Sequence, residues 1–256
     1  MTTVIIIIER AALAIRARPA SLLLWQRVLP NIMGVGEHRR MTHDAQDLTS
    51  PSAEFWEPLH QSAEPVTAPP PNVRLTELVR DLELAPGHAC DLGSGRGGDA
   101  RWLASLGWRV TATEVSATAV GRIADMAAAQ GLDRLRAERH DLSRTLPAGP
   151  FDLVYACYFH SPVAFGREDV LRRAARQVAV GGRLILVDHA STAPWSWRFG
   201  DEEPTFPTPE ETLDVLMLGD GWTTERCESA ERVANGPDGA TANVTDNVIV
   251  VRRRHA

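Results

Sequence analysis

The sequence of 256 residues contains no lysine, so its 27 strongly basic side chains are all arginines. Without a lysine ammonium group the chain can neither form a Schiff base with pyridoxal phosphate nor carry the lysine of a P-loop. This absence excludes pyridoxal enzymes and Walker-type nucleoside triphosphatases.

Cysteine is also scarce. Cys90, Cys157 and Cys227 lie far apart, match no metal-binding spacing and indicate no disulfide framework. We therefore expect a reducing, cytoplasmic compartment and no metal site. The net charge of −6 argues against a nucleic-acid partner. The apolar run Val4–Ile8 is too short to cross a bilayer, so we expect no membrane span.

The first part of the chain shows little periodic pattern. We expect residues 1–50 to form a poorly ordered arm. Residues 51–72 contain the pair Phe55-Trp56 among several prolines, which argue against regular helix and favour a lid or substrate segment. Apolar residues at helical spacing predict a helix over 73–84, at the start of the main domain, 73–256.

From residue 88 onward the pattern alternates between strand and helix. This alternation predicts an α/β fold of Rossmann-like type, a three-layer sandwich with a mostly parallel sheet. Glycines 181 and 182 are expected to stop the helix over 168–178. The expected strands cover 88–92, 108–113, 135–140, 151–156, 183–187, 223–233 and 241–251, and the last two form an antiparallel hairpin.

The stretch 89–99 contains the main motif. A buried strand ends at Asp91, a glycine turn follows, and a helix begins near Gly97. Glycines let a ligand approach the main chain closely, and the free N–H groups of a helix start favour polar or anionic atoms. This pattern is typical of a nucleotide-type cofactor site.

Two cofactor classes fit this motif. Gly93, Gly95 and Gly98 satisfy the dinucleotide fingerprint, with Glu114 at about the expected distance, so a nicotinamide-dependent oxidoreductase is one reading. S-adenosylmethionine is favoured by the acidic Asp91 before the glycines, by a third strand end suited to adenine, and by the terminal hairpin.

The motifs at residues 91–98, 114–116, 151–156 and 181–187 together resemble class I S-adenosylmethionine-dependent methyltransferases. Within this class, the pair Phe55-Trp56 and the stretches 97–100 and 157–160 resemble the small-molecule enzymes of the tellurite-resistance and thiopurine type. The resemblance implies a seven-stranded sheet with an antiparallel C-terminal strand. It also implies that the acid and glycines of the turn bind the methionine part, that the second strand end binds the ribose and that the third binds the adenine. The residues expected at the cofactor are Asp91, Gly93, Ser94, Gly95, Gly97, Glu114, Val115, Asp141, Leu142 and Cys157.

Methyl transfer needs position and desolvation, and for some acceptors a base. His160, just past the fourth expected strand, is the candidate base or orienting group, although a histidine there could also simply pack a loop. Tyr158 is the second catalytic candidate, with a pocket wall as its structural alternative. His189 follows the fifth strand in a similar position.

Three tryptophans, Trp56, Trp195 and Trp197, are lid candidates. Arg96 in the glycine turn favours an anionic acceptor. The sequence thus predicts methyl transfer to a small molecule through oxygen, nitrogen, sulfur or a heavier chalcogen. A nicotinamide-dependent oxidoreductase and a non-catalytic S-adenosylmethionine-binding protein remain as alternatives, and a homodimer is compatible with each.

Overall fold

The computed structural model describes residues 50–196 and 205–255. Residues 1–49 of the expected N-terminal arm and the lid candidate Trp197 lie outside these ranges.

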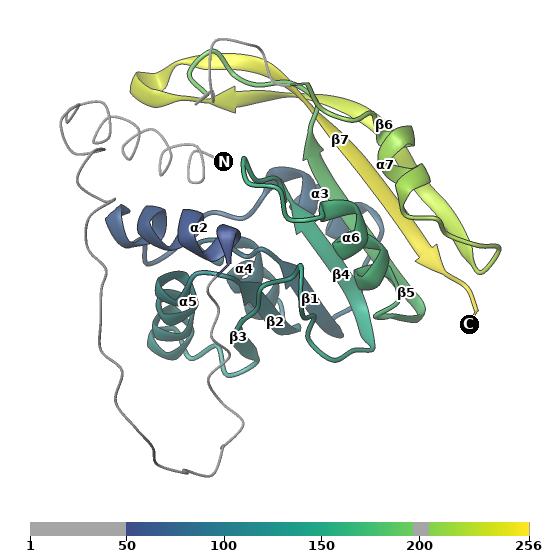
Figure 1. Ribbon diagram of the computed structural model, residues 1–256, viewed down its shortest axis with the longest axis horizontal. Helices are drawn as coiled ribbons and strands as arrows, with labels where there is room; N and C mark the ends of the chain where they lie inside the picture. Colours follow the sequence, from purple (N-terminus) through teal and green to yellow (C-terminus); the bar gives the residue numbers. More distant parts are fainter. Residues whose placement is uncertain (1–49, 197–204, 256) are drawn as a thin grey trace, which may run out of the picture.

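Seven strands form one sheet in the order β3-β2-β1-β4-β5-β7-β6 (Figure 1). All neighbours pair in parallel except β5 with β7 and β6 with β7, so β7 alone runs against the others. This is the predicted sheet, with its antiparallel C-terminal strand. The strands are β1 His88–Leu92, β2 Arg109–Glu114, β3 Leu135–Arg139, β4 Phe151–Cys157, β5 Val178–His189, β6 Trp222–Asn235 and β7 Thr241–Arg253.

Helices cover both faces of the sheet. One hydrophobic cluster joins α3, α4 and α5 to one face, and a second joins α6 and α7 to the other. The described helices are α2 Pro51–Ser62, α3 Val73–Asp81, α4 Gly98–Ser105, α5 Ala117–Ala129, α6 Arg167–Ala175 and α7 Pro209–Val215, with the short 3-10 helix η1 Pro237–Gly239. The layers confirm the predicted three-layer sandwich.

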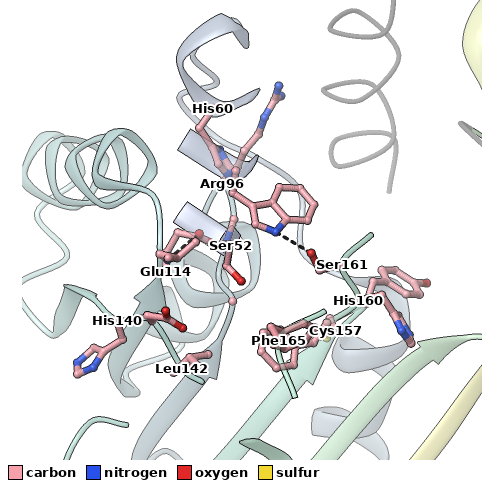
Figure 2. A pocket seen from close by; sticks show the side chains of 17 residues that line it. Ser52, His60, Arg96, Glu114, His140, Leu142, Cys157, His160, Ser161 and Phe165 are labelled. Carbon is pink, nitrogen blue, oxygen red and sulfur yellow. Dashed lines mark hydrogen bonds between the residues drawn. The ribbon is translucent and has the colours of Figure 1, made fainter. Parts of the chain in front are cut away.

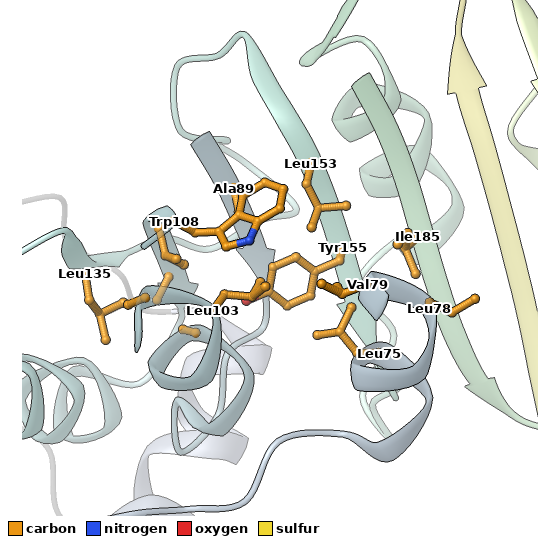
Figure 3. Close-up of a cluster of buried hydrophobic side chains, with 14 of the residues drawn as sticks. Leu75, Leu78, Val79, Ala89, Leu103, Trp108, Leu135, Leu153, Tyr155 and Ile185 are labelled. Carbon is orange, nitrogen blue, oxygen red and sulfur yellow. The ribbon is translucent and has the colours of Figure 1, made fainter. Parts of the chain in front are cut away.

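Aliphatic side chains fill the first face (Figure 3). Leu75 of α3 and Leu103 of α4 are fully buried there against Tyr155 of β4 and Ile185 of β5. Because residues two apart in a strand share a face, the apolar residues of β4 and β5 divide between the two clusters. Burial on both faces explains why these strands read as continuous apolar runs.

The expectation that prolines keep residues 51–72 out of regular helix is wrong for α2. Ser50 caps this helix, its side chain accepting a hydrogen bond from Ala53 N at 3.2 Å. Pro51 occupies the first turn, where a backbone N–H has no helical partner anyway. Pro58 lies inside the helix, which thus forms despite the loss of one backbone donor.

The expected glycine stop after α6 is also misplaced. The helix already ends at Ala175, and β5 begins at Val178, so Gly181 and Gly182 lie inside the strand. A Cβ on Gly182 would stand 2.8 Å from the carbonyl oxygen of Asp152, where the β4–β5 register shifts. Gly182 therefore permits close strand contact at an irregularity in the sheet, and Gly181 adopts a φ of +86° there.

Within the described residues, no helix combines the length and the apolar character that a bilayer crossing requires.

Candidate active site

The site is a cleft at the carboxyl ends of the central strands, beside the point where the strand order reverses between β1 and β4. Ligands in open α/β sheets bind at such a point. The cleft encloses about 850 Å³, part of it open to solvent, and its lining is mostly apolar. Figure 2 shows Glu114, His140 and Leu142 toward one end, and Cys157, His160 and Ser161 toward the other.

The glycine loop forms the floor between these ends. Gly93 has φ +70°, and a Cβ there would stand 2.7 Å from the ring of Phe159. Gly95 has φ +54° with no atom near the position of a Cβ, so space above its main chain is open to a ligand. Ser94 N donates to Thr113 O at 2.8 Å, which ties the loop to the end of β2.

Two acids lie beneath this loop. Asp91 is 3% exposed, and its Oδ2 has no hydrogen-bond partner within residues 50–196 and 205–255. Burial, together with the nearby acids Asp99 and Glu114, raises the pKa of Asp91 well above its usual range. Burial likewise raises the pKa of Asp99, whose carboxylate accepts a hydrogen bond from Asn72 N. This concentration of acidity would be relieved by a cationic ligand.

Glu114 ends β2 and faces the cleft. Its Oε2 accepts a hydrogen bond from Gly95 N at 3.0 Å, and its Oε1 accepts from Val115 N at 2.7 Å and Ser116 N at 3.1 Å. The carboxylate is thereby fixed in position and only 7% exposed. Its remaining lone pairs can accept the two hydroxyls of a ribose.

Asp141 and Leu142 follow β3. Asp141 Oδ1 accepts hydrogen bonds from Ser143 N at 3.0 Å and Ser143 Oγ at 2.6 Å. Burial raises the pKa of Asp141, but hydrogen bonds from Ser143 and Ser50 outweigh this effect, so the pKa lies below its usual range. An ionised acceptor beside an apolar wall suits the amino group and the ring of an adenine.

The end of β4 leads into the other half of the cleft. Tyr158 has φ +55° and its ring lines the cleft, but its hydroxyl donates to Asp246 Oδ1 at 2.9 Å and accepts from Arg232 Nη2 at 3.2 Å. Burial raises the pKa of this phenol. A hydroxyl held in this way favours the wall role of Tyr158 over proton transfer.

His160 lines the cleft with its side chain 26% exposed. Its Nε2 lies 3.2 Å from Oδ1 of the buried Asp188, whose other oxygen accepts a hydrogen bond from Arg167. His189 stacks on Tyr158, with ring centroids 3.9 Å apart, and does not line the cleft.

Helix α2 covers the cleft and supplies Ser52, Trp56 and His60 to its lining. Trp56 Nε1 donates to Ser161 Oγ at 3.2 Å, which bridges α2 to the segment after β4 (Figure 2). Glu57 accepts hydrogen bonds from the side chains at the start of α5. The helix therefore closes over the cleft from the side of α5.

The structure brings most of the predicted site residues together. Those that line the cleft are Gly93, Gly95, Glu114, Val115, Asp141, Leu142, Cys157, Tyr158 and His160. Asp91 and Ser94 do not line it but lie in the strand end and loop beneath, while Gly97 caps α4 and faces Ile123. The lid candidate Trp195 instead packs in a separate cluster with Ala193 and the hairpin.

The residues that sequence reasoning missed come from segments without a motif: Ser52, His60, Ser161 and Phe165. The amphipathic pattern around the capping Ser50 and Pro51 is the one signal that could have revealed α2. Within the described ranges, no group of three or more histidine, cysteine or acidic side chains is arranged to hold a metal ion.

Comparison with known proteins identifies the domain. Residues 89–182 match the family model described as "Methyltransferase domain". A sarcosine/dimethylglycine N-methyltransferase of Halorhodospira halochloris is 36% identical over 121 residues, covering 45% of this chain and 42% of the relative. The matched region thus spans less than half of the curated relatives' length.

Solved structures share the fold. One, titled for the conversion of a disulfide bond into a thioacetal group during echinomycin biosynthesis, has a TM-score of 0.60 at 21% identity, covering 80% of this chain and 93% of that one. TehB from Haemophilus influenzae has a TM-score of 0.55 at 14% identity, with coverages of 79% and 67%. Residues 89–182 therefore correspond to a methyltransferase domain, and the described residues share the Rossmann-like fold of these solved structures.

Proposed function

We propose that this protein transfers a methyl group from S-adenosylmethionine to a small-molecule acceptor. The observation that carries the proposal is the glycine loop, open above Gly95 and underlain by the acids Asp91 and Asp99. The ammonium and sulfonium groups of this cofactor are the kind of charge that such acids attract.

The residues present fit the cofactor. Asp91, whose Oδ2 has no hydrogen-bond partner among the described residues, and the loop at Gly93 and Gly95 would hold the methionine part. Glu114 would accept the ribose hydroxyls, and Asp141 the adenine amino group, with Leu142 against the ring. A cleft of this size and apolar character is typical of a site for a small organic molecule.

The chemistry asks mainly for position. In an in-line displacement the lone pair of the acceptor forms a bond to the methyl carbon as the carbon–sulfur bond breaks and its electrons remain on sulfur. Trp56 and Phe165 exclude water at the acceptor end. His160 would orient the acceptor or take its proton, and Tyr158 would form the wall beside it.

The acceptor class is small because α2 closes the cleft and Trp56 bridges to Ser161 across it. Nitrogen, oxygen, sulfur and heavier chalcogens all remain candidate acceptor atoms. Arg96 lies in the lining, is half-buried and has no ion-pair partner among the described residues, which supports an acidic group on the acceptor. The free cysteines and net charge of −6 support a cytoplasmic protein without a nucleic-acid partner. A homodimer is compatible with the proposal.

The test is transfer of radiolabelled methyl from S-adenosylmethionine to a panel of amines such as sarcosine, thiols, phenols and chalcogenides. We expect a labelled product that depends on the protein and is suppressed by S-adenosylhomocysteine. Binding of S-adenosylhomocysteine without transfer to the panel or to a metabolite extract would indicate the non-catalytic alternative. Binding of NADPH in its place would indicate an oxidoreductase.

A further inference from the structure

A buried charged pair lies directly behind the candidate base. Asp188, the penultimate residue of β5, is 2% exposed, and Arg167 begins α6 with its side chain 14% exposed. An Arg167 Nη2–H group donates to Asp188 Oδ2, and its Nε–H donates to the carbonyl of Phe159 at 2.9 Å. The guanidinium therefore secures one carboxylate oxygen and the chain segment that carries His160.

The other carboxylate oxygen faces the imidazole. Asp188 Oδ1 lies 3.2 Å from His160 Nε2, an ion-pair distance, and within residues 50–196 and 205–255 neither atom makes a hydrogen bond of regular geometry. Burial alone raises the pKa of Asp188, but His160 and Arg167 together hold it below its usual range. Asp188 is thus an ionised acceptor with one oxygen available to the ring.

Among residues 50–196 and 205–255, Asp188 is the acid that pairs with His160. His189, whose ring centroid is 6.2 Å away, has its pKa lowered to about 4, first by burial and then by His160 itself, and stays neutral. Phe206 meets the His160 ring edge to face at 5.8 Å. In the described part of the chain, the groups that face this imidazole are therefore Asp188, the neutral His189 and the ring of Phe206, with Arg167 beyond the carboxylate.

We infer that Asp188 is a positioning residue, which holds His160 as the tautomer protonated on Nε2 and leaves Nδ1 as the atom that accepts the proton of the methyl acceptor. This inference rests on the proposed function and narrows it. A base positioned in this way serves an acceptor that must lose a proton, such as an amine, a thiol or a hydroxyl compound. It gives no advantage to a thioether or another acceptor that carries no proton.

Arg167 makes the substitution Asp188→Asn informative. The guanidinium requires an acceptor, so the amide oxygen of the asparagine turns to it and the NH₂ group turns to His160. An NH₂ group facing Nε2 favours the opposite tautomer, protonated on Nδ1, which cannot take a proton from the acceptor. Arg167→Gln, in contrast, keeps the carboxylate and should keep the original tautomer.

The test is the nitrogen NMR spectrum of the histidine side chains in the full chain, with His160 assigned by its loss in His160→Gln. We expect the Nε2–H tautomer in the wild type and in Arg167→Gln, and the Nδ1–H tautomer in Asp188→Asn. Asp169→Asn, an exposed acid on the same helix as Arg167, should leave the spectrum unchanged. If Asp188→Asn does not fold, an Nδ1–H tautomer in the wild type alone overturns the inference.

The spectrum requires no turnover, so it separates this inference from the proposed function. With an acceptor from the panel, Asp188→Asn should lower kcat by roughly 10²–10⁴-fold, the usual contribution of a general base. KM and the affinity for S-adenosylhomocysteine should change little. An unchanged kcat and unchanged pH profile with a protonated acceptor, or equal loss of kcat and cofactor affinity, would contradict the positioning role.

Discussion

Replacing Glu114 by glutamine should weaken cofactor binding, and the hydrogen bonds of Glu114 indicate by how much the Kd should rise. Glu114 Oε1 accepts two backbone N–H groups, whereas Oε2 accepts one, from Gly95. The amide oxygen of a glutamine will therefore occupy the Oε1 position, and its NH₂ group will face Gly95 N–H. The substitution removes an anchor of the glycine loop and an acceptor for a ribose hydroxyl at the same time.

A hydrogen bond to a charged group contributes about 1.5–3 kcal/mol. The loss of one such bond to the ligand predicts a Kd for S-adenosylhomocysteine that is roughly 10- to 100-fold higher, measured by isothermal titration calorimetry. Glu138→Gln is the matched control, since Glu138 lies on neighbouring β3 and does not line the cleft. An unchanged Kd for Glu114→Gln, or equal weakening in both variants, would refute the reasoning.

Three further predictions concern Gly95 in the glycine loop, the buried Asp91 and Glu57 of helix α2. Gly95→Ala should lower the free energy of unfolding in chemical denaturation by about 1–2 kcal/mol, because φ at this position is +54°. It should also weaken S-adenosylhomocysteine binding, because the added methyl group fills the open space above the loop, and full affinity would contradict this. The pKa of Asp91 is raised, so a ligand with a cationic group, such as the ammonium of S-adenosylhomocysteine, must displace the proton of Asp91 at low pH. The affinity for S-adenosylhomocysteine should therefore increase with pH, and its binding should release protons in calorimetry. Asp91→Asn should abolish both effects. Burial raises the pKa of Glu57, but hydrogen bonds from Thr118 and Ser116 outweigh this effect and bring the pKa to about 2. The stability that the Glu57 carboxylate contributes should therefore be present above pH 4.5 and be lost between about pH 4.5 and 2. A difference in thermal midpoint between wild type and Glu57→Gln that does not shrink over this range would contradict the prediction.

The sheet could be predicted because its information is local. The central strands β4 and β5 contain continuous apolar runs, and the glycine loop after Asp91 and the acid at Glu114 mark two further strand ends by themselves. The order of the strands follows from alternation with helices and the connection rules of parallel sheets. The residues that line the cofactor half of the cleft were therefore accessible from sequence.

The acceptor half was less accessible because it is assembled from distant segments. Helix α2 contains Pro58, and it forms with a cap from Ser50 and with Glu57 docked at the start of α5. The contact of Glu57 with α5 is a tertiary interaction that the local sequence pattern does not contain. The sequence offers the hydroxyl of Tyr158 as a catalytic candidate, but it could not predict that this hydroxyl bonds to Asp246 and Arg232. Neither partner is close to Tyr158 in sequence.

The central claim is that the glycine loop binds an adenosyl cofactor. The most direct measurement is calorimetric titration of the wild-type protein with S-adenosylhomocysteine, with NADPH titrated in parallel. The account predicts one molecule of S-adenosylhomocysteine bound per chain and no heat from NADPH. The account would be contradicted if S-adenosylhomocysteine gave no binding heat, or if NADPH bound saturably and S-adenosylhomocysteine could not displace it.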